Sequence, residues 1–191
     1  MPQSLSFVII HLIFSTKDRR GFLDGEFRSR MHGYLASICR KHRCECFRVG
    51  GTGDHVHLAV RLSRTITIAK IVEQLKSSSS IWAKEQSPNL YVFAWQRGYG
   101  CFSISPRDLD RLTAYIDNQE EHHRKRTFQE EFRMFLDKYG VKYNEAYRCG
   151  PKATLLRNIQ ATSVDKKRFT DAFWPHRVQR PCFRLVLNVW D

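Results

Sequence analysis

The sequence predicts an α+β fold, and the order of its elements is the main reason. Segments with strand character and segments with helical periodicity follow one another as strand, helix, strand, strand, helix and strand, and then as further helices. This order is typical of the split β-α-β arrangement of ferredoxin-like and RRM-like proteins. We therefore expect an α/β two-layer sandwich: an antiparallel sheet with helices on one face, and an extra C-terminal helix.

The first half of the chain supplies three of the four expected strands. Residues 7–15 (FVIIHLIFS) are rich in β-branched and aromatic side chains, which predicts a buried strand. Residues 24–42 place apolar side chains three and four positions apart after an acidic start, which predicts a helix. Residues 44–62 contain two strand-like runs around a glycine-rich turn, and this pattern indicates a hairpin.

The second half of the chain is mostly helical. Residues 67–85 predict an amphipathic helix, and residues 91–105 predict extended structure with a break at the glycines near its end. A third helix is expected over 107–125, directly after a proline. A fourth is expected over 127–140, with Thr127 as its N-cap.

The last segment departs from this pattern. Residues 150–191 have weak periodicity and carry eight Lys and Arg against three Asp. We expect residues 1–149 to form one domain and residues 150–191 to be an appended basic tail, with a composition compatible with disorder. Its charge would add nonspecific affinity for DNA and have little part in the chemistry.

The overall charge favours nucleic acid as the partner. The 191 residues include 32 Lys and Arg against 19 Asp and Glu, a formal charge of +13, and clustered cations bind phosphates by releasing counterions. The six cysteines show no zinc-site spacing, which favours reduced thiols. No signal peptide or membrane span is expected, so the predicted location is the cytoplasm.

Two histidines occupy alternate positions of the run that follows the glycine-rich turn. Strand side chains alternate between faces, so Val56, Leu58 and Val60 share the face expected to pack on helices. His55 and His57 then share the other face, which we expect to be open, about 6–7 Å apart along the strand. Two imidazoles in this relation can bind one metal ion.

The helix predicted over 107–125 offers side chains that could complete such a site. Tyr115 and Gln119 are four residues apart, so in a continuous helix they lie on one face, about 6 Å apart along the axis. Each has an ordinary explanation when taken alone, because helical tyrosines are commonly core residues and glutamines are commonly solvated. His11, on the first strand, is expected to be structural.

The combination of these motifs resembles a known family. The runs DHVHLAV, LKSSSSIW, WQRGYGCFSIS and LTAYIDNQEEHHRKRTFQEEF together resemble the HUH tyrosine transposases of insertion sequences 200 and 605. The resemblance spans about residues 7 to 148 and is greatest to the REP-associated relatives. It implies a bacterial, nucleoid-associated enzyme, a transposase with single-strand endonuclease activity on hairpin or REP-like DNA.

The resemblance also implies roles for individual residues. A divalent metal, Mg²⁺ or Mn²⁺, would be bound at the positions of His55, His57 and Gln119. Tyr115 would be the nucleophile and would form a 5′-phosphotyrosine intermediate. Because family members include dimers that exchange the tyrosine helix, a homodimer is a possible partner arrangement.

A basic run ends the same helix. We expect Arg124, Lys125 and Arg126 to contact the DNA backbone, and we assign the preceding His122 and His123 to this basic helix end rather than to a metal site.

Two other functions remain open at this level. A histidine-triad phosphoester hydrolase would need a third histidine where this chain has Ala59, which argues against it. A non-catalytic or degenerate protein that binds DNA hairpins stays open, because a chain of this charge binds DNA whether or not it cuts it. A covalent protein–DNA adduct separates these functions.

Overall fold

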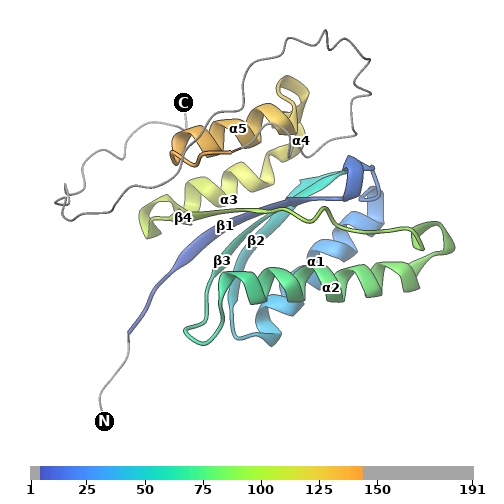
Figure 1. Ribbon diagram of the computed structural model, residues 1–191, viewed down its shortest axis with the longest axis horizontal. Helices are drawn as coiled ribbons and strands as arrows, with labels where there is room; N and C mark the ends of the chain where they lie inside the picture. The colour runs from blue at the N-terminus through green and yellow to red at the C-terminus, as the bar shows by residue number, and fades with distance from the viewer. Residues whose placement is uncertain (1–4, 144–191) are drawn as a thin grey trace, which may run out of the picture. The chain divides into compact units, whose positions relative to one another are not determined.

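Four strands form a single antiparallel sheet in the order β2-β3-β1-β4 (Figure 1). The computed structural model describes residues 5–143. The expected α+β class and ferredoxin-like order of elements are confirmed in this part of the chain. The strands are β1 (Ile9–Ser15), β2 (Glu45–Thr52), β3 (His55–Arg61) and β4 (Gly100–Ile104).

Five α-helices accompany the sheet in the described range. Short 3-10 helices precede or follow them. One of these, η1 (Lys17–Arg19), lies beside the candidate site described below. The α-helices are α1 (Gly25–Lys41), α2 (Ile68–Gln86), α3 (Leu109–Asp117), α4 (Gln119–Lys125) and α5 (Phe128–Lys138).

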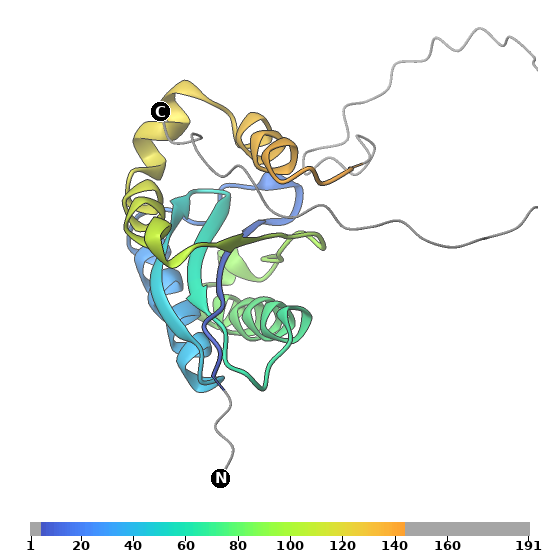
Figure 2. The same ribbon diagram turned by 90° about the vertical axis from the view of Figure 1, so that its left-hand side faces the viewer.

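One face of the sheet carries the main apolar core. Val56, Leu58 and Val60 of β3 are fully buried there, as the alternation of the strand predicts. Helices α1 and α2 cover this face (Figures 1 and 2) and contribute buried side chains such as Leu35 and Leu75. The apolar face of the hairpin was therefore predicted correctly.

The opposite face is covered as well, and the expectation of an open face with helices on one side only is wrong. Helices α3, α4 and α5 lie over it (Figure 2), and His55 and His57 are completely buried. A second, smaller apolar cluster adjoins these histidines. It consists of Ile13, Phe102, Phe128, Phe135 and Leu136.

Residues 107–125 form a broken helix instead of the single one expected. Helix α3 ends at Asp117 and α4 begins at Gln119, with Asn118 between them at φ −93° and ψ 16°. Asp and Asn have low helix propensity, because their side chains compete for backbone hydrogen bonds. Tyr115 and Gln119 therefore lie on different helices, and their spacing in a continuous helix does not apply.

The extended segment before β4 has a structural task. Only its last part pairs as a strand, while Trp95 forms an isolated bridge with Thr16. The Trp95 indole N–H donates to Ser79 Oγ, 2.8 Å away, and so ties this segment to α2. The backbone of residues 94–96 thereby holds the chain just before η1 in place.

None of the helices within residues 5–143 is long and apolar enough to cross a membrane. The expected tail, residues 150–191, lies outside the described residues.

A test of the covered face uses Gly50 of β2, the partner of His57 in the sheet. A Cβ at Gly50 would lie 2.6 Å from both Cγ2 and the carbonyl oxygen of Ile116 on α3. We expect Gly50→Ala to lower the free energy of unfolding in urea by about 1–3 kcal/mol, because α3 must move. In Gly33→Ala on α1 a Cβ meets nothing within 4 Å, so stability should rise by about 0.5–1 kcal/mol. Equal midpoints for Gly50→Ala and the wild type would contradict the close approach of α3.

Candidate active site

A layer of polar side chains is buried between β3 and the helices that cover it. His55 and His57 come from β3, Gln119 and His123 from α4, and Glu131 from α5. One ligating atom from each histidine and from Glu131 lies within 4.8 Å of all the others in this set. Gln119 lies among them and is 1% exposed. Five side chains from three separate elements thus converge on one point.

The amide of Gln119 lies in contact with this set. Its Oε1 lies 3.3 Å from His55 Nε2 and 3.0 Å from His123 Nε2. Its Nε2 donates to Glu131 Oε1 at 3.1 Å. The second carboxylate oxygen, Glu131 Oε2, lies 3.2 Å from His123 Nε2 and 3.7 Å from His57 Nε2. Gln119 and Glu131 therefore present oxygen atoms to all three imidazoles.

The hairpin turn fixes the tautomer of His55. His55 Nδ1 lies 2.7 Å from Asp54 Oδ1. Burial alone would raise the pKa of Asp54, but the hydrogen bond and charge of His55, together with the Arg19 guanidinium, hold it well below its usual range. Because an ionised carboxylate only accepts, His55 Nδ1 carries the proton and Nε2 keeps its lone pair. This carboxylate–histidine arrangement is the common support of a metal-ligating imidazole.

The tautomer of His123 is fixed in the same way. Its Nδ1 donates to the carbonyl oxygen of Arg126, 3.0 Å away, and this oxygen can only accept. The lone pair of His123 Nε2 therefore points at the oxygens of Gln119 and Glu131. Burial, with the nearby His55, lowers the pKa of His123 to about 4, so the imidazole is neutral at pH 7.

His57 is supported from β1. His57 Nδ1 and His11 Nε2 are 2.9 Å apart and share one proton. Burial lowers the pKa of His11 to about 3, and burial with the charges of neighbouring histidines lowers the pKa of His57 well below 6.5. The expectation of a structural role for His11 agrees with this contact.

The donor set fits a divalent cation. Imidazole lone pairs facing carbonyl and carboxylate oxygens at 3.0–3.3 Å repel one another unless a cation or a proton lies between them. Metal–ligand bonds of about 2.1 Å place adjacent octahedral ligands about 3.0 Å apart, which matches these separations. Neutral imidazoles are the form that binds metal. Burial raises the pKa of Glu131 to about 8, since its charge is costly there without a cation.

Tyr115 lies against the same histidines. Its ring centroid is 5.8 Å from that of His57 and 5.3 Å from that of His122, in edge-to-face arrangements. A ring of α3 and one histidine of β3, which precedes it by 58 residues, are thus in contact within one chain. Tyr115 and Gln119 therefore both lie beside the histidine pair, although the helix between them is broken.

The sequence-predicted residues divide into two groups. His55, His57, Gln119 and Tyr115 come together at one place. Arg124, Lys125 and Arg126 lie exposed at the end of α4, and Arg124 makes an ion pair with Glu121 at 2.9 Å.

Two members of the cluster were missed by sequence reasoning. His123 was assigned to the basic helix end, and the structure corrects this, because its imidazole is turned inward on Gln119 and Glu131. The spacing of Gln119 and His123, four residues apart on one helix, was a usable signal. Thr127 and Glu130 have the spacing of a capping box, but no such pattern predicts that the neighbouring Glu131 points inward.

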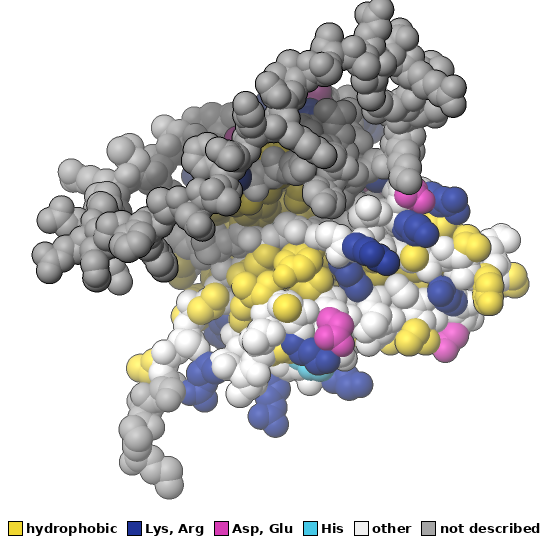
Figure 3. Space-filling view, in the orientation of Figure 1, with side chains coloured by type: hydrophobic (Ala, Val, Ile, Leu, Met, Phe, Trp, Pro, Cys, Tyr) yellow, Lys and Arg dark blue, Asp and Glu magenta, His cyan; other side chains and the backbone are white. Residues whose placement is uncertain are grey.

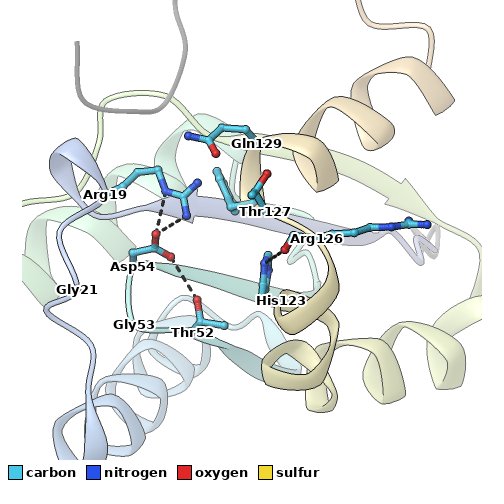
Figure 4. A pocket seen from close by; sticks show the side chains of 10 residues that line it. Arg19, Gly21, Thr52, Gly53, Asp54, His123, Arg126, Thr127 and Gln129 are labelled. Carbon is cyan, nitrogen blue, oxygen red and sulfur yellow. Dashed lines mark hydrogen bonds and ion pairs between the residues drawn. The ribbon is translucent and has the colours of Figure 1, made fainter. Parts of the chain in front are cut away.

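A pocket of about 420 Å³ opens beside the cluster (Figure 4). It is bordered by η1 and the loop after it, the hairpin turn, and the junction of α4 and α5. The Arg19 guanidinium lies over the Phe128 ring at 4.6 Å and donates to Asp54 Oδ2 at 2.8 Å. Asp18 and Arg19 both adopt φ of 55°, a conformation that non-glycine residues hold at a cost and that is common near functional sites. His123 borders both the pocket and the cluster.

Comparison with known proteins gives consistent matches. The family model described as "Transposase IS200 like" matches residues 4–119. The transposases for insertion sequence element IS200 of Salmonella typhimurium and Salmonella typhi are each 23% identical over 112 residues, covering 59% of this chain and 74% of theirs.

Two solved structures are also similar. A putative transposase from Deinococcus radiodurans has 23% identity and a TM-score of 0.49, over 62% of this chain and 98% of that one. A REP-associated tyrosine transposase bound to a REP hairpin has 13% identity and a TM-score of 0.48, over 64% and 74% of the two chains.

The support of His55 by the turn can be tested with Asp54→Asn. The amide can no longer act as a purely accepting partner, so the tautomer of His55 is no longer fixed. We expect the affinity for Mn²⁺, measured by titration calorimetry, to fall by about 10–100-fold. The control is Asp137→Asn, an exposed carboxylate on α5, which should bind Mn²⁺ as the wild type does. Unchanged affinity in Asp54→Asn would show that the turn does not orient a ligand.

Proposed function

Because this chain belongs to the IS200-like transposase family, we propose that it cleaves and rejoins hairpin-containing single-stranded DNA. Tyr115 is the nucleophile, and His55, His57 and Gln119 bind a divalent metal ion, Mg²⁺ or Mn²⁺. The product of cleavage is a 5′-phosphotyrosine and a free 3′-hydroxyl.

The observation that carries this proposal is the convergence of Tyr115 with the histidine pair. The ring of Tyr115 is in edge contact with His57, and Gln119 Oε1 reaches His55. A tyrosine in an apolar core needs no imidazoles around it, and a structural histidine pair needs no tyrosine. Their meeting point supports a reaction centre.

The reaction requires a nucleophile and its alignment with the phosphorus atom. The oxygen of Tyr115 attacks the phosphorus, an O–P bond forms, and the bond from phosphorus to the 3′-oxygen breaks. The tyrosine proton leaves to solvent or to a neighbouring base, and the departing 3′-oxygen takes up a proton. A bound divalent cation supplies charge neutralisation of the phosphate, which matters because free tyrosine has a pKa near 10.

The same residues serve the rejoining step. The phosphotyrosine bond keeps the energy of the phosphodiester, so the 3′-hydroxyl of another end can attack it without ATP. Tyr115 is then released and regains its proton. Since Tyr115 already contacts His57 of its own chain, we propose that the site works within one chain, although a homodimer is compatible with this.

Basic side chains near the site support DNA binding. Figure 3 shows Lys and Arg side chains in scattered groups on the visible described surface, with fewer acidic ones among them. Arg124, Lys125 and Arg126 are exposed at the end of α4, where Arg126 borders the pocket, and are proposed to bind backbone phosphates. With chromosomal DNA as substrate, the protein would act at the bacterial nucleoid in the cytoplasm.

The nucleophile is tested by Tyr115→Phe. The change removes one hydroxyl, so DNA binding should persist while the covalent adduct disappears. Wild type and variant are incubated with 3′-labelled hairpin DNA and Mn²⁺, and label that migrates with denatured protein is measured. We expect a loss of at least about 10³-fold, because phenylalanine has no nucleophilic oxygen.

Tyr91→Phe is the matched control, since Tyr91 is 75% exposed and outside the site, and its adduct should equal that of the wild type. An adduct that survives in Tyr115→Phe would move the nucleophile to another residue, with Tyr139, Tyr143 and Tyr147 as the nearest rivals in the sequence. No adduct in the wild type, with binding intact, would favour the non-catalytic hairpin-binding alternative.

The role of the basic run is tested by the salt dependence of binding. Replacing Arg124 and Lys125 by Ala should reduce the slope of log K against log salt by about 1.4, or about 0.7 for each lost single-strand phosphate contact. Gel shifts of hairpin DNA over a salt series measure this slope. The matched control replaces Arg40 and Lys41 at the end of α1, on the other face of the sheet. Equal slopes for both double variants would exclude a specific role for the run on α4.

A further inference from the structure

Helix α5 places a carboxylate where an apolar side chain would be expected. Phe128 and Phe135 of this helix are buried in the second apolar cluster, and Glu131 between them is only 2% exposed. The helix begins with a capping box between Thr127 and Glu130, which uses the neighbouring glutamate for local structure. Glu131 has no such local task, so its buried charge calls for a different explanation.

The surroundings of Glu131 are rich in lone pairs. Its Oε1 accepts from Gln119 at 3.1 Å. Within the described range 5–143, its Oε2 and the Nε2 of His57 each have no hydrogen-bond partner, and they face each other at 3.7 Å. The lone pair of His123 Nε2 reaches the same Oε2 at 3.2 Å. Three atoms that can donate electron pairs to a cation therefore converge at one place.

Such an arrangement is costly without a cation. A buried carboxylate without a partner costs several kcal/mol, and replacing it by an apolar side chain of similar size is commonly neutral or favourable. A metal ion removes the cost, because it accepts electron pairs from all of these atoms at once. The separations of 3.2 and 3.7 Å are somewhat longer than the about 3.0 Å between adjacent octahedral ligands of one ion, so small side-chain movements bring these atoms to it.

We propose that Glu131 and His123 are ligands of the metal ion beside the histidine pair, so that the bound ion links α5 to the sheet. This inference rests on the proposed metal-dependent function and adds two residues beyond position 119, where the match to the family model ends. Glu131 gives the site an anionic oxygen that the set of His55, His57 and Gln119 lacks. The set of three imidazoles with oxygens favours Mn²⁺ over Mg²⁺.

Gln119 differs from the other proposed ligands in how strongly it would bind the metal. A neutral amide oxygen is the weakest donor of the set, and Gln119 keeps a second contact through its N–H to Glu131. A DNA phosphate would therefore take the place of Gln119 Oε1 more readily than that of the three imidazoles or the carboxylate.

The test measures metal binding directly, without any reaction. Mn²⁺ is titrated calorimetrically into the full chain and into Glu131→Gln. We expect the dissociation constant to rise at least about tenfold in Glu131→Gln. The matched control is Glu121→Gln, whose side chain is 57% exposed and pairs with Arg124. This control should bind Mn²⁺ as the wild type does, and equal affinity in Glu131→Gln would overturn the proposal.

Melting temperatures measured without metal distinguish a purely structural role of Glu131 from a role as a metal ligand. In EDTA, Glu131→Gln should unfold at the same temperature as the wild type or higher, because it replaces a carboxyl group whose burial is costly without a cation. Added Mn²⁺ should raise the melting temperature of the wild type more than that of Glu131→Gln. A variant that is less stable in EDTA but gains as much from Mn²⁺ as the wild type would overturn the ligand role.

Hydrogen exchange on the unmutated chain decides the matter even if Glu131→Gln fails to fold. Mn²⁺ should slow exchange of the α5 amides, residues 128–138, together with those of β3. Slowing confined to β3 and α4 would overturn the role of Glu131 but leave the proposed function intact. If the wild type binds no divalent ion at all, the metal-dependent function and this inference both fail.

Discussion

The burial of unprotonated imidazole nitrogens beside carbonyl and carboxylate oxygens is the constraint on which the rest of this structure depends. His55 and His57 are fully buried, and Gln119 and Glu131 are nearly so. Buried polar atoms without partners cost free energy. In this layer, hydrogen-bond acceptors on the imidazoles face acceptor oxygens of Gln119 and Glu131. Contacts on the far side of two imidazoles fix this arrangement. The Nδ1 protons of His55 and His123 are bound to Asp54 and to the carbonyl of Arg126, so they do not lie between the facing acceptors.

Two glycines allow helices to cover this layer so closely. Gly50 of β2 lies under Ile116 of α3, and Gly100 of β4 lies under Phe132 of α5, where a Cβ would come within 2.7 Å of the ring. These strands are the two edges of the sheet. Small residues at both edges let α3 and α5 approach the backbone, so Tyr115 and Glu131 reach histidines that lie on the strands between.

Sequence reasoning found side chains that come together beside β3 better than it found their surroundings. The alternation of β3 is a rigid consequence of strand geometry, so the shared face of His55 and His57 was predictable. What covers that face was not, because it depends on the docking of α3 to α5, and docking leaves no local pattern. The break at Asn118 was missed although Asp-Asn is a weak helix former. Glu131 was not found, because the capping box of Thr127 accounts for Glu130 but no pattern predicts that the glutamate beside it faces the sheet.

The metal and α5 are energetically linked if Glu131 is a ligand. The ion then binds more tightly when α5 is docked, and by linkage it stabilises docking by the same free energy. The Arg19 side of the layer opens into the pocket, which His123 also borders. Under the proposed function, a DNA phosphate that approached from there would reach the metal position beside the junction of α4 and α5, where the chain passes through Arg126 and Thr127. The proposed nucleophile and the first three proposed ligands thus lie within residues 4–119, which match the family model, and His123 and Glu131 lie just after them. Variation after residue 119 can therefore change the affinity for the metal without changing Tyr115.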